Sequence, residues 1–370
     1  MAASRSEHPP LPEAGDGFRR RSPIGGPGLE VVRYAYLRRV VAPVLRGLGI
    51  RFTEAVARRL ARGVFEMNGL GRRRAEARLR AAMPDAPASD IAAIGEASYE
   101  HWARFWAEAL FIPRRLGGRH WRRYVDISPE GELGALAASG RGCILAMAYH
   151  GNIAAGTCAL GRLFQPIHVV VDRFTQPALA AWQRALYAQP DVQPIDRRDA
   201  AATLPRILSD GGAVVMVAEH ERRRGRAIET RFLGRTLRGY PTLGRLARWF
   251  DVPVAVVTCR REPKPFRFTL ALHDVFEPDA DEARCFRDVM ATLERAVMAS
   301  PEQYLWSAPT AADSAGDTSS PEALASVIGT GIESGSFRRR RRTASAWRSR
   351  SAADKRPADS AAATARAPTA

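Results

Sequence analysis

Cysteine, lysine and long hydrophobic runs are scarce in this sequence of 370 residues. The four cysteines lie far apart and form no CxxC pair, which excludes a disulfide-rich scaffold and a zinc finger and fits a reducing compartment. No uncharged apolar stretch reaches the roughly 18 residues that a transmembrane helix needs. Residues 1–27 contain no hydrophobic signal core. We therefore expect a cytoplasmic protein without a membrane span, which can still lie on a membrane surface.

Nucleotide-binding loops and internal repeats are also missing. Neither a GxGxxG sequence nor a Walker loop occurs, which argues against nucleotide-dependent chemistry. Hydrophobic residues make up 46% of the chain, enough to build a core and to exclude disorder throughout. The length allows one large domain or two ordinary ones.

The chain is strongly basic. Its 56 lysines and arginines exceed its 39 acidic residues and give a formal charge of +17, and only Lys264 and Lys355 are lysines. Such an excess predicts an anionic partner, which is a membrane surface, an acidic carrier protein, a phosphorylated substrate or a nucleic acid.

Composition divides the chain into four segments. Residues 1–28 and 311–370 lack apolar periodicity, so we expect both to be disordered. The second of these tails carries the run Arg338–Arg342, which either binds an anionic lipid or nucleic acid or is simply solvated. Between the tails, we expect a basic helical region over residues 29–125 and an α/β core over residues 126–310.

The helical region combines an apolar stripe with basic charge. Apolar residues recur at the spacing of a helix, at Tyr34, Leu37, Val41, Leu45 and Leu48. Pro43 interrupts this stripe and predicts a kink or the start of a new helix. Residues 28–124 contain 19 arginines against nine acidic residues. The pattern favours peripheral contact with an anionic bilayer, the alternative being that the stripe packs on the rest of the protein. A second stripe, around Trp102 and Phe105, predicts core packing.

The core changes to short apolar runs separated by helical stretches. These runs predict strands at residues 143–148, 167–171, 213–218, 254–259 and 268–272. Near-continuous apolar strands alternating with helices are typical of a mostly parallel sheet covered on both faces. Because sites in such sheets collect beyond the carboxyl ends of the strands, the rule selects three segments, Tyr149–Asn152, Asp172–Arg173 and Glu219–His220.

His150 is the strongest candidate for chemistry in these segments. It follows a predicted buried strand, and its neutral imidazole can accept a proton from an attacking hydroxyl near pH 7. Gly151 allows close approach of the backbone, and the helix expected after Asn152 can stabilise an oxyanion with its N-terminus. The alternative is a histidine that serves packing and hydrogen bonding only.

Several blocks of the sequence resemble the bacterial lipid A biosynthesis (late) acyltransferases of the lysophospholipid acyltransferase superfamily. The blocks are residues 77–84 (ARLRAAMP), 140–152 (GRGCILAMAYHGN), 195–200 (IDRRDA), 211–219 (GGAVVMVAE), 232–236 (FLGRT) and 301–306 (PEQYLW). The resemblance runs from about Val40 to Trp306. It implies transfer of a fatty acyl chain from acyl carrier protein or acyl-CoA to a hydroxyl of a glycolipid such as a lipid A precursor, without a cofactor. It also implies a peripheral location on the cytoplasmic face of the bacterial inner membrane.

The sequence departs from the family at its central motif. In the family a histidine deprotonates the acceptor hydroxyl, and an acidic residue five positions later orients that histidine. Five positions after His150 stands Ala155. When Gly151 and Asn152 are aligned with the family's G-N instead, Tyr149 takes the histidine position and Ala154 the acidic one. We expect Glu219, at the end of another strand, to replace the missing acid, and Asp172, which follows the strand predicted at residues 167–171, is the second candidate.

The remaining candidate site residues lie at or shortly after the ends of the predicted strands. Tyr149, Gly151 and Asn152 are expected to contact substrate. Arg173, Arg222 and Arg260 are candidates for binding anionic groups, Arg260 because it matches a family arginine near the site.

Three hypotheses of different classes remain at this stage. The first is an active membrane-peripheral acyltransferase, and the second is a degenerate acyltransferase-like protein that binds lipid or carrier protein. The third is a nucleic-acid-binding protein that uses Arg338–Arg342; the rest of the chain contains no nucleic-acid-binding motif to support it.

Overall fold

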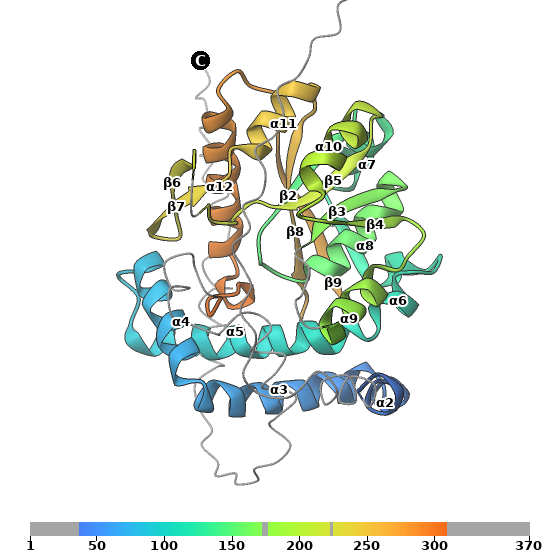
Figure 1. The fold of residues 1–370 in the computed structure, drawn as a ribbon. Helices are drawn as coiled ribbons and strands as arrows, with labels where there is room; N and C mark the ends of the chain where they lie inside the picture. Colours follow the sequence, from blue (N-terminus) through green and yellow to red (C-terminus); the bar gives the residue numbers. More distant parts are fainter. Residues whose placement is uncertain (1–36, 172–176, 223–224, 309–370) are drawn as a thin grey trace, which may run out of the picture.

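The structure is a computed structural model that describes residues 37–171, 177–222 and 225–308 (Figure 1). The two segments for which the sequence predicts disorder, residues 1–28 and 311–370, lie outside the described residues.

A seven-stranded sheet forms the centre of the protein, in the order β1-β9-β8-β2-β5-β3-β4. Five neighbouring strands, from β8 to β4, are parallel, whereas β9 is antiparallel to β8 and pairs in parallel with β1. The strands are β1 (Val125–Ser128), β2 (Cys143–Met147), β3 (Ile167–Val171), β4 (Val192–Asp196), β5 (Ala213–Val217), β8 (Val254–Arg261) and β9 (Phe268–Phe276). The predicted mostly parallel sheet is confirmed.

Helices cover both faces of the sheet, because side chains of successive residues in each strand point to opposite faces. In β2, Leu145 belongs to one core and Ala146 to the other. The first core is closed by α7 (Glu130–Ala138), α8 (Ile153–Phe164) and α9 (Pro177–Tyr187). The second is closed by α10 (Ala200–Ser209), α11 (Thr242–Phe250) and α12 (Glu282–Met298), together with the hairpin β6 (Ile228–Phe232) and β7 (Arg235–Gly239) (Figure 1).

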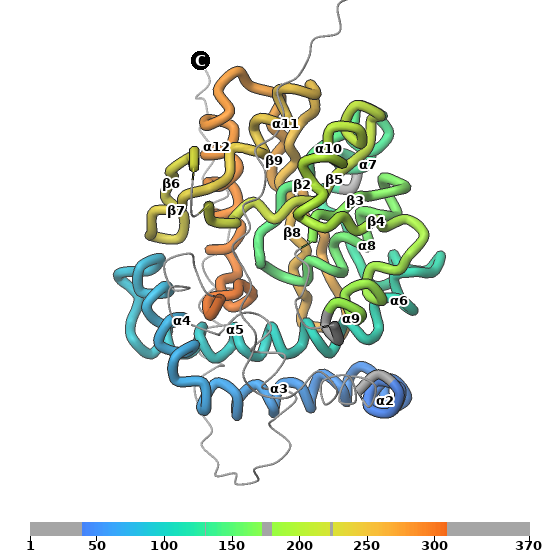
Figure 2. The backbone as a smooth tube through the Cα atoms, in the orientation of Figure 1, coloured from blue at the N-terminus to red at the C-terminus, as the bar shows by residue number. Residues whose placement is uncertain are grey.

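The basic region forms the helices η1 (Leu37–Val41), α2 (Ala42–Leu48), α3 (Ile50–Met67), α4 (Gly69–Ala82), α5 (Ala88–Ala109) and α6 (Ile112–Arg115). Pro43 stands in the first turn of α2, where a proline's missing N–H costs nothing. Helix α5 lies between α3 and the sheet (Figures 1 and 2) and buries Trp102 and Phe105 in the core, as their spacing predicts. None of the described helices combines the length and the apolarity needed to cross a bilayer.

Candidate active site

The carboxyl ends of β2 and β5 lie side by side, because these strands pair in parallel from Cys143 and Ala213 onward. The segment Tyr149–Asn152 follows β2, and Glu219 follows β5. The backbone N–H of Tyr149 donates a hydrogen bond to Glu219 Oε1. The structure thus brings together two of the three segments that the strand-end rule selects; the third, Asp172–Arg173, is outside the described residues.

Glu219 is a buried carboxylate that organises this edge of the sheet. Its second oxygen accepts a hydrogen bond from the hydroxyl of Tyr304. Burial raises the pKa of Glu219 above its ordinary value of 4.5, and the hydrogen bonds from Tyr304 and Tyr149 act in the opposite direction. Among the described residues, no hydrogen bond joins Glu219 to His150. The carboxylate is therefore placed to hold the backbone of Tyr149 rather than to orient the imidazole.

His150 is enclosed, with 1% of its surface exposed. Its Nε2 lies 3.2 Å from the carbonyl oxygen of Ser300 and 2.9 Å from the hydroxyl of the same residue. Because a carbonyl only accepts, Nε2 carries the proton, and the unprotonated Nδ1 has no hydrogen-bond partner within the described part of the chain. Burial lowers the pKa of His150 to about 4. A neutral imidazole fits the predicted base, but this ring is enclosed and the contacts of its Nε2 are both to Ser300.

Gly151 and Asn152 shape the turn into α8. Gly151 has φ +67°, and a Cβ there would collide with the carbonyl oxygen of Cys259, so only glycine fits the approach of β8. The side chain of Asn152 is fully buried and caps α8 by accepting a hydrogen bond from the N–H of Ala155 at 2.9 Å. The structure therefore gives both residues a clear role in building the turn.

A buried ion pair stands behind this turn, and sequence reasoning missed it. Arg261 donates to both carboxylate oxygens of Glu108, each at 2.6 Å, and both side chains are almost fully buried. Asn152 Nδ2 donates to the same carboxylate at 2.8 Å. His101 donates from Nε2 to the carbonyl of Gly151 at 3.1 Å and accepts from Arg261 at Nδ1. The network fixes the turn from the side of α5 and β8.

Strand alternation is the signal that points to Arg261. Cys259 and Arg261 are buried, whereas Arg260 between them is exposed and pairs with Glu262 at 3.0 Å. The predicted Arg260 thus stands on the strand face opposite the ion pair, and its neighbour Arg261 enters the site. Glu108 gives no such signal, because its partner is 153 positions away in the sequence.

Of the two other predicted arginines, the structure describes Arg222. Arg173 is outside the described residues. The backbone N–H of Arg222 donates to the carbonyl of Arg238 in β7 at 2.7 Å, and its guanidinium lies 5.1 Å from the ring centre of Tyr240. Its backbone contact therefore anchors the segment after β5 to the hairpin.

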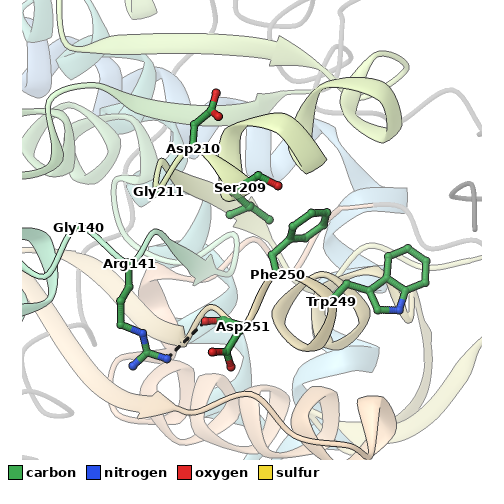
Figure 3. Close-up of a pocket in the computed structure, with 9 residues that line it drawn as sticks. Gly140, Arg141, Ser209, Asp210, Gly211, Trp249, Phe250 and Asp251 are labelled. Carbon is green, nitrogen blue, oxygen red and sulfur yellow. Dashed lines mark hydrogen bonds between the residues drawn. The ribbon is translucent and has the colours of Figure 1, made fainter. Parts of the chain in front are cut away.

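A pocket of about 570 Å³ opens at the opposite edge of the sheet (Figure 3). Its lining comes from the turns that precede β2, β5 and β8, with Arg141 and Gly211, and from the last residues of α10 and α11, including Trp249. Arg141 is engaged there with Glu277 at 3.0 Å and with the carbonyl of Asp251. Because this pocket lies at the amino ends of the strands, it is separate from the candidate site. The described residues contain no cluster of three or more histidine, cysteine, aspartate or glutamate side chains suited to a metal ion.

Comparison with known families identifies the chain. The family described as bacterial lipid A biosynthesis acyltransferase matches residues 24–309, more than three quarters of the sequence. The chain belongs to this family. No individual curated protein matches it significantly. Membership in a lipid A acyltransferase family implies an acyltransferase, with an acyl donor and a lipid acceptor in general terms.

In this acyltransferase family member, the PEQYLW block (residues 301–306) has a structural role beside the site segment. Gly151 N–H donates to the carbonyl of Gln303 at 3.0 Å, and Leu305 N–H donates to the carbonyl of Tyr149 at 3.1 Å. The Gln303 side chain exchanges two hydrogen bonds with the backbone of Arg261. The block thus runs beside the site segment as an extra backbone ladder and holds it against β8.

The departure from the family motif is also visible in the acyltransferase structure. Ala154 and Ala155, which stand where the two alignments place the acidic residue, are both fully buried in α8. Glu108 is a carboxylate beside the same turn, but Arg261 occupies both of its oxygens.

Proposed function

We propose that the protein transfers a fatty acyl chain from a thioester donor, acyl carrier protein or acyl-CoA, to a hydroxyl of a glycolipid such as a lipid A precursor. In this reaction the hydroxyl oxygen attacks the thioester carbonyl, the new C–O bond forms, the C–S bond breaks and the hydroxyl proton passes through a protein base to the thiolate. The observation that carries the proposal is the family match over both the helical region and the sheet.

The proposal includes peripheral attachment to the cytoplasmic face of the inner membrane. The outward side of α2 and α3 supports it, because large apolar side chains are exposed there beside arginines. Val44, Leu48 and Phe52 are 55%, 55% and 47% exposed. From residue 38 to residue 62 the chain has seven arginines and one acidic residue, Glu54, which is buried and paired with Arg104. Such a surface suits the headgroup region of anionic lipids.

Transfer is tested directly with purified protein. Labelled long-chain acyl-CoA and acyl-carrier-protein thioesters are each mixed with vesicles that contain a lipid A precursor or another glycolipid. Labelled lipid is separated by chromatography and identified by mass spectrometry, and free thiol is measured in parallel. We expect equal amounts of acylated lipid and thiol. Protein that binds these vesicles but forms neither product with any donor would contradict the proposal.

A specific observation favours the alternative, a degenerate acyltransferase-like protein that binds lipid or carrier protein. Neither alignment of the motif supplies an acid, and His150 is enclosed. This hypothesis predicts vesicle or carrier binding without product in the same assay, so one experiment separates the two functions.

A further inference from the structure

The base in acyl transfer must reach the acceptor hydroxyl within about 2.6–3.2 Å, or through one water. Among the described histidines, His101 and His150 are 4% and 1% exposed, and both rings are held by interior hydrogen bonds. His120 precedes the outermost strand β1, and His168 and His273 lie within β3 and β9. None of these three histidines follows the carboxyl end of a strand. His220 is only partly buried, and it stands three residues after the carboxyl end of β5.

His220 contacts the residue that replaces the family's histidine. Its ring centre is 5.8 Å from that of Tyr149, in an edge-to-face arrangement with an interplanar angle of 86°. Tyr149 takes the histidine position when Gly151 and Asn152 are aligned with the family's G-N. An imidazole therefore lies beside this position, although it follows the neighbouring strand β5 and not β2.

The backbone around His220 is anchored on both sides. Before it, Glu219 is bonded to Tyr149 and Tyr304. After it, Glu221 pairs with Arg235 of β7, and the N–H of the next residue donates to the carbonyl of Arg238. A base held in this way keeps its position without reorganising during the reaction.

A buried donor that has no acceptor among the described residues also lies beside Tyr149. Trp102 of α5 is 6% exposed, its ring centre is 6.5 Å from that of Tyr149, and its indole N–H has no hydrogen-bond partner among the described residues. Buried N–H groups are nearly always bonded. An oxygen of a bound ligand near Tyr149 would satisfy this donor.

We propose that His220 is the base of acyl transfer and that Tyr149 and Trp102 line the place where the reacting groups bind. The imidazole accepts the proton of the acceptor hydroxyl as its oxygen attacks the thioester carbonyl, and it returns that proton to the thiolate as the C–S bond breaks. His150 then serves to hold the turn through Ser300. The inference rests on the proposed acyl transfer and names the residue that performs its proton transfer.

The test compares alanine variants in the transfer assay, with the donor and acceptor that the parent protein uses. His220→Ala should lower kcat by about 10²- to 10⁴-fold, the usual contribution of a positioned base, without changing the circular dichroism spectrum. Because His220 is partly exposed, free imidazole can enter the space left by the ring and should restore part of the rate. His120→Ala, a matched change at an exposed histidine before β1, should behave like the parent.

Two results would overturn the assignment while the proposed function stands. One is a His220→Ala protein that transfers at the parental rate, whereas folded His150→Gln protein does not. The other is a loss in His220→Ala that imidazole does not relieve. A parent protein that transfers no acyl group from any donor would instead refute the proposed function itself.

Discussion

At the scale of single residues, His150 should make the protein sensitive to acid. The folded state binds a proton on this ring only below about pH 4, whereas the ordinary pKa of histidine is 6.5. The unfolded chain therefore binds more protons between these values, and stability is lost as pH falls through this window. Between pH 7 and pH 5 the loss is about 2 kcal/mol, because one pKa unit corresponds to about 1.4 kcal/mol.

Replacing His150 by Gln should remove this loss of stability between pH 7 and pH 5, because glutamine does not titrate. Glutamine also keeps an N–H donor for Ser300. Urea unfolding at pH 7 and pH 5 measures the difference. We expect the free energy of unfolding to fall less between the two pH values in His150→Gln than in the parent. His120→Gln, at an exposed site, should retain the parental fall. Equal falls in all three proteins would show that His150 is not held neutral in the fold.

Residue roles were harder to predict from the sequence than residue positions. The strand-end rule correctly brought Tyr149 and Glu219 to one edge of the sheet, because parallel strands align their carboxyl ends. It could not give the partners of each side chain, which depend on contacts over long separations. The predicted pairing of His150 with Glu219 has no such contact, and the ion pair of Glu108 with Arg261 joins helices and strands that no local pattern relates.

At the scale of elements, the period of the apolar residues was the reliable signal. All five predicted strands are present, and four of them lie in the parallel part of the sheet, where buried strands are nearly continuous apolar runs. β1 (VDIS), β4 (VQPID) and the hairpin β6–β7 were not predicted. These strands mix buried with exposed residues and contain polar and charged side chains, so their sequences do not differ clearly from those of loops.

The outward face of α2 and α3 leads to a prediction for this element. If Phe52 enters the lipid interface, Phe52→Asp should weaken binding to phosphatidylglycerol vesicles by about 10-fold or more, because burial of such a side chain contributes about 1.5–3 kcal/mol. Stability should change little, since Phe52 is 47% exposed. Vesicle sedimentation measures the binding.

The matched control is Val275→Asp, a change of another exposed apolar side chain, on β9. It adds the same negative charge to the protein but leaves α2 and α3 intact, so binding should stay near that of the parent. An equal loss in both variants would mean that total charge, rather than this face, determines the attachment.

At the scale of the whole molecule, the net charge of the C-terminal segment can be separated from that of the rest of the chain. Residues 311–370 contain ten basic and six acidic residues, a net +4, so that the rest of the chain carries +13 of the total +17. Most of the electrostatic attraction to an anionic membrane therefore belongs to residues 1–310. The hypothesis of nucleic-acid binding, in contrast, depends on the run Arg338–Arg342, which lies within residues 311–370.

A protein that ends at residue 310 should keep its melting temperature, because residues 311–370 lack the apolar periodicity of a packed element. It should also still bind anionic vesicles, and the binding of both proteins should weaken with rising salt, since charges are screened beyond about 8 Å at physiological ionic strength. Thermal denaturation and vesicle sedimentation at several salt concentrations provide the two measurements. A large fall in melting temperature would show that the segment packs on the body. Loss of vesicle binding on truncation would place the attachment in the tail, and DNA binding that disappears with it would support the nucleic-acid hypothesis instead.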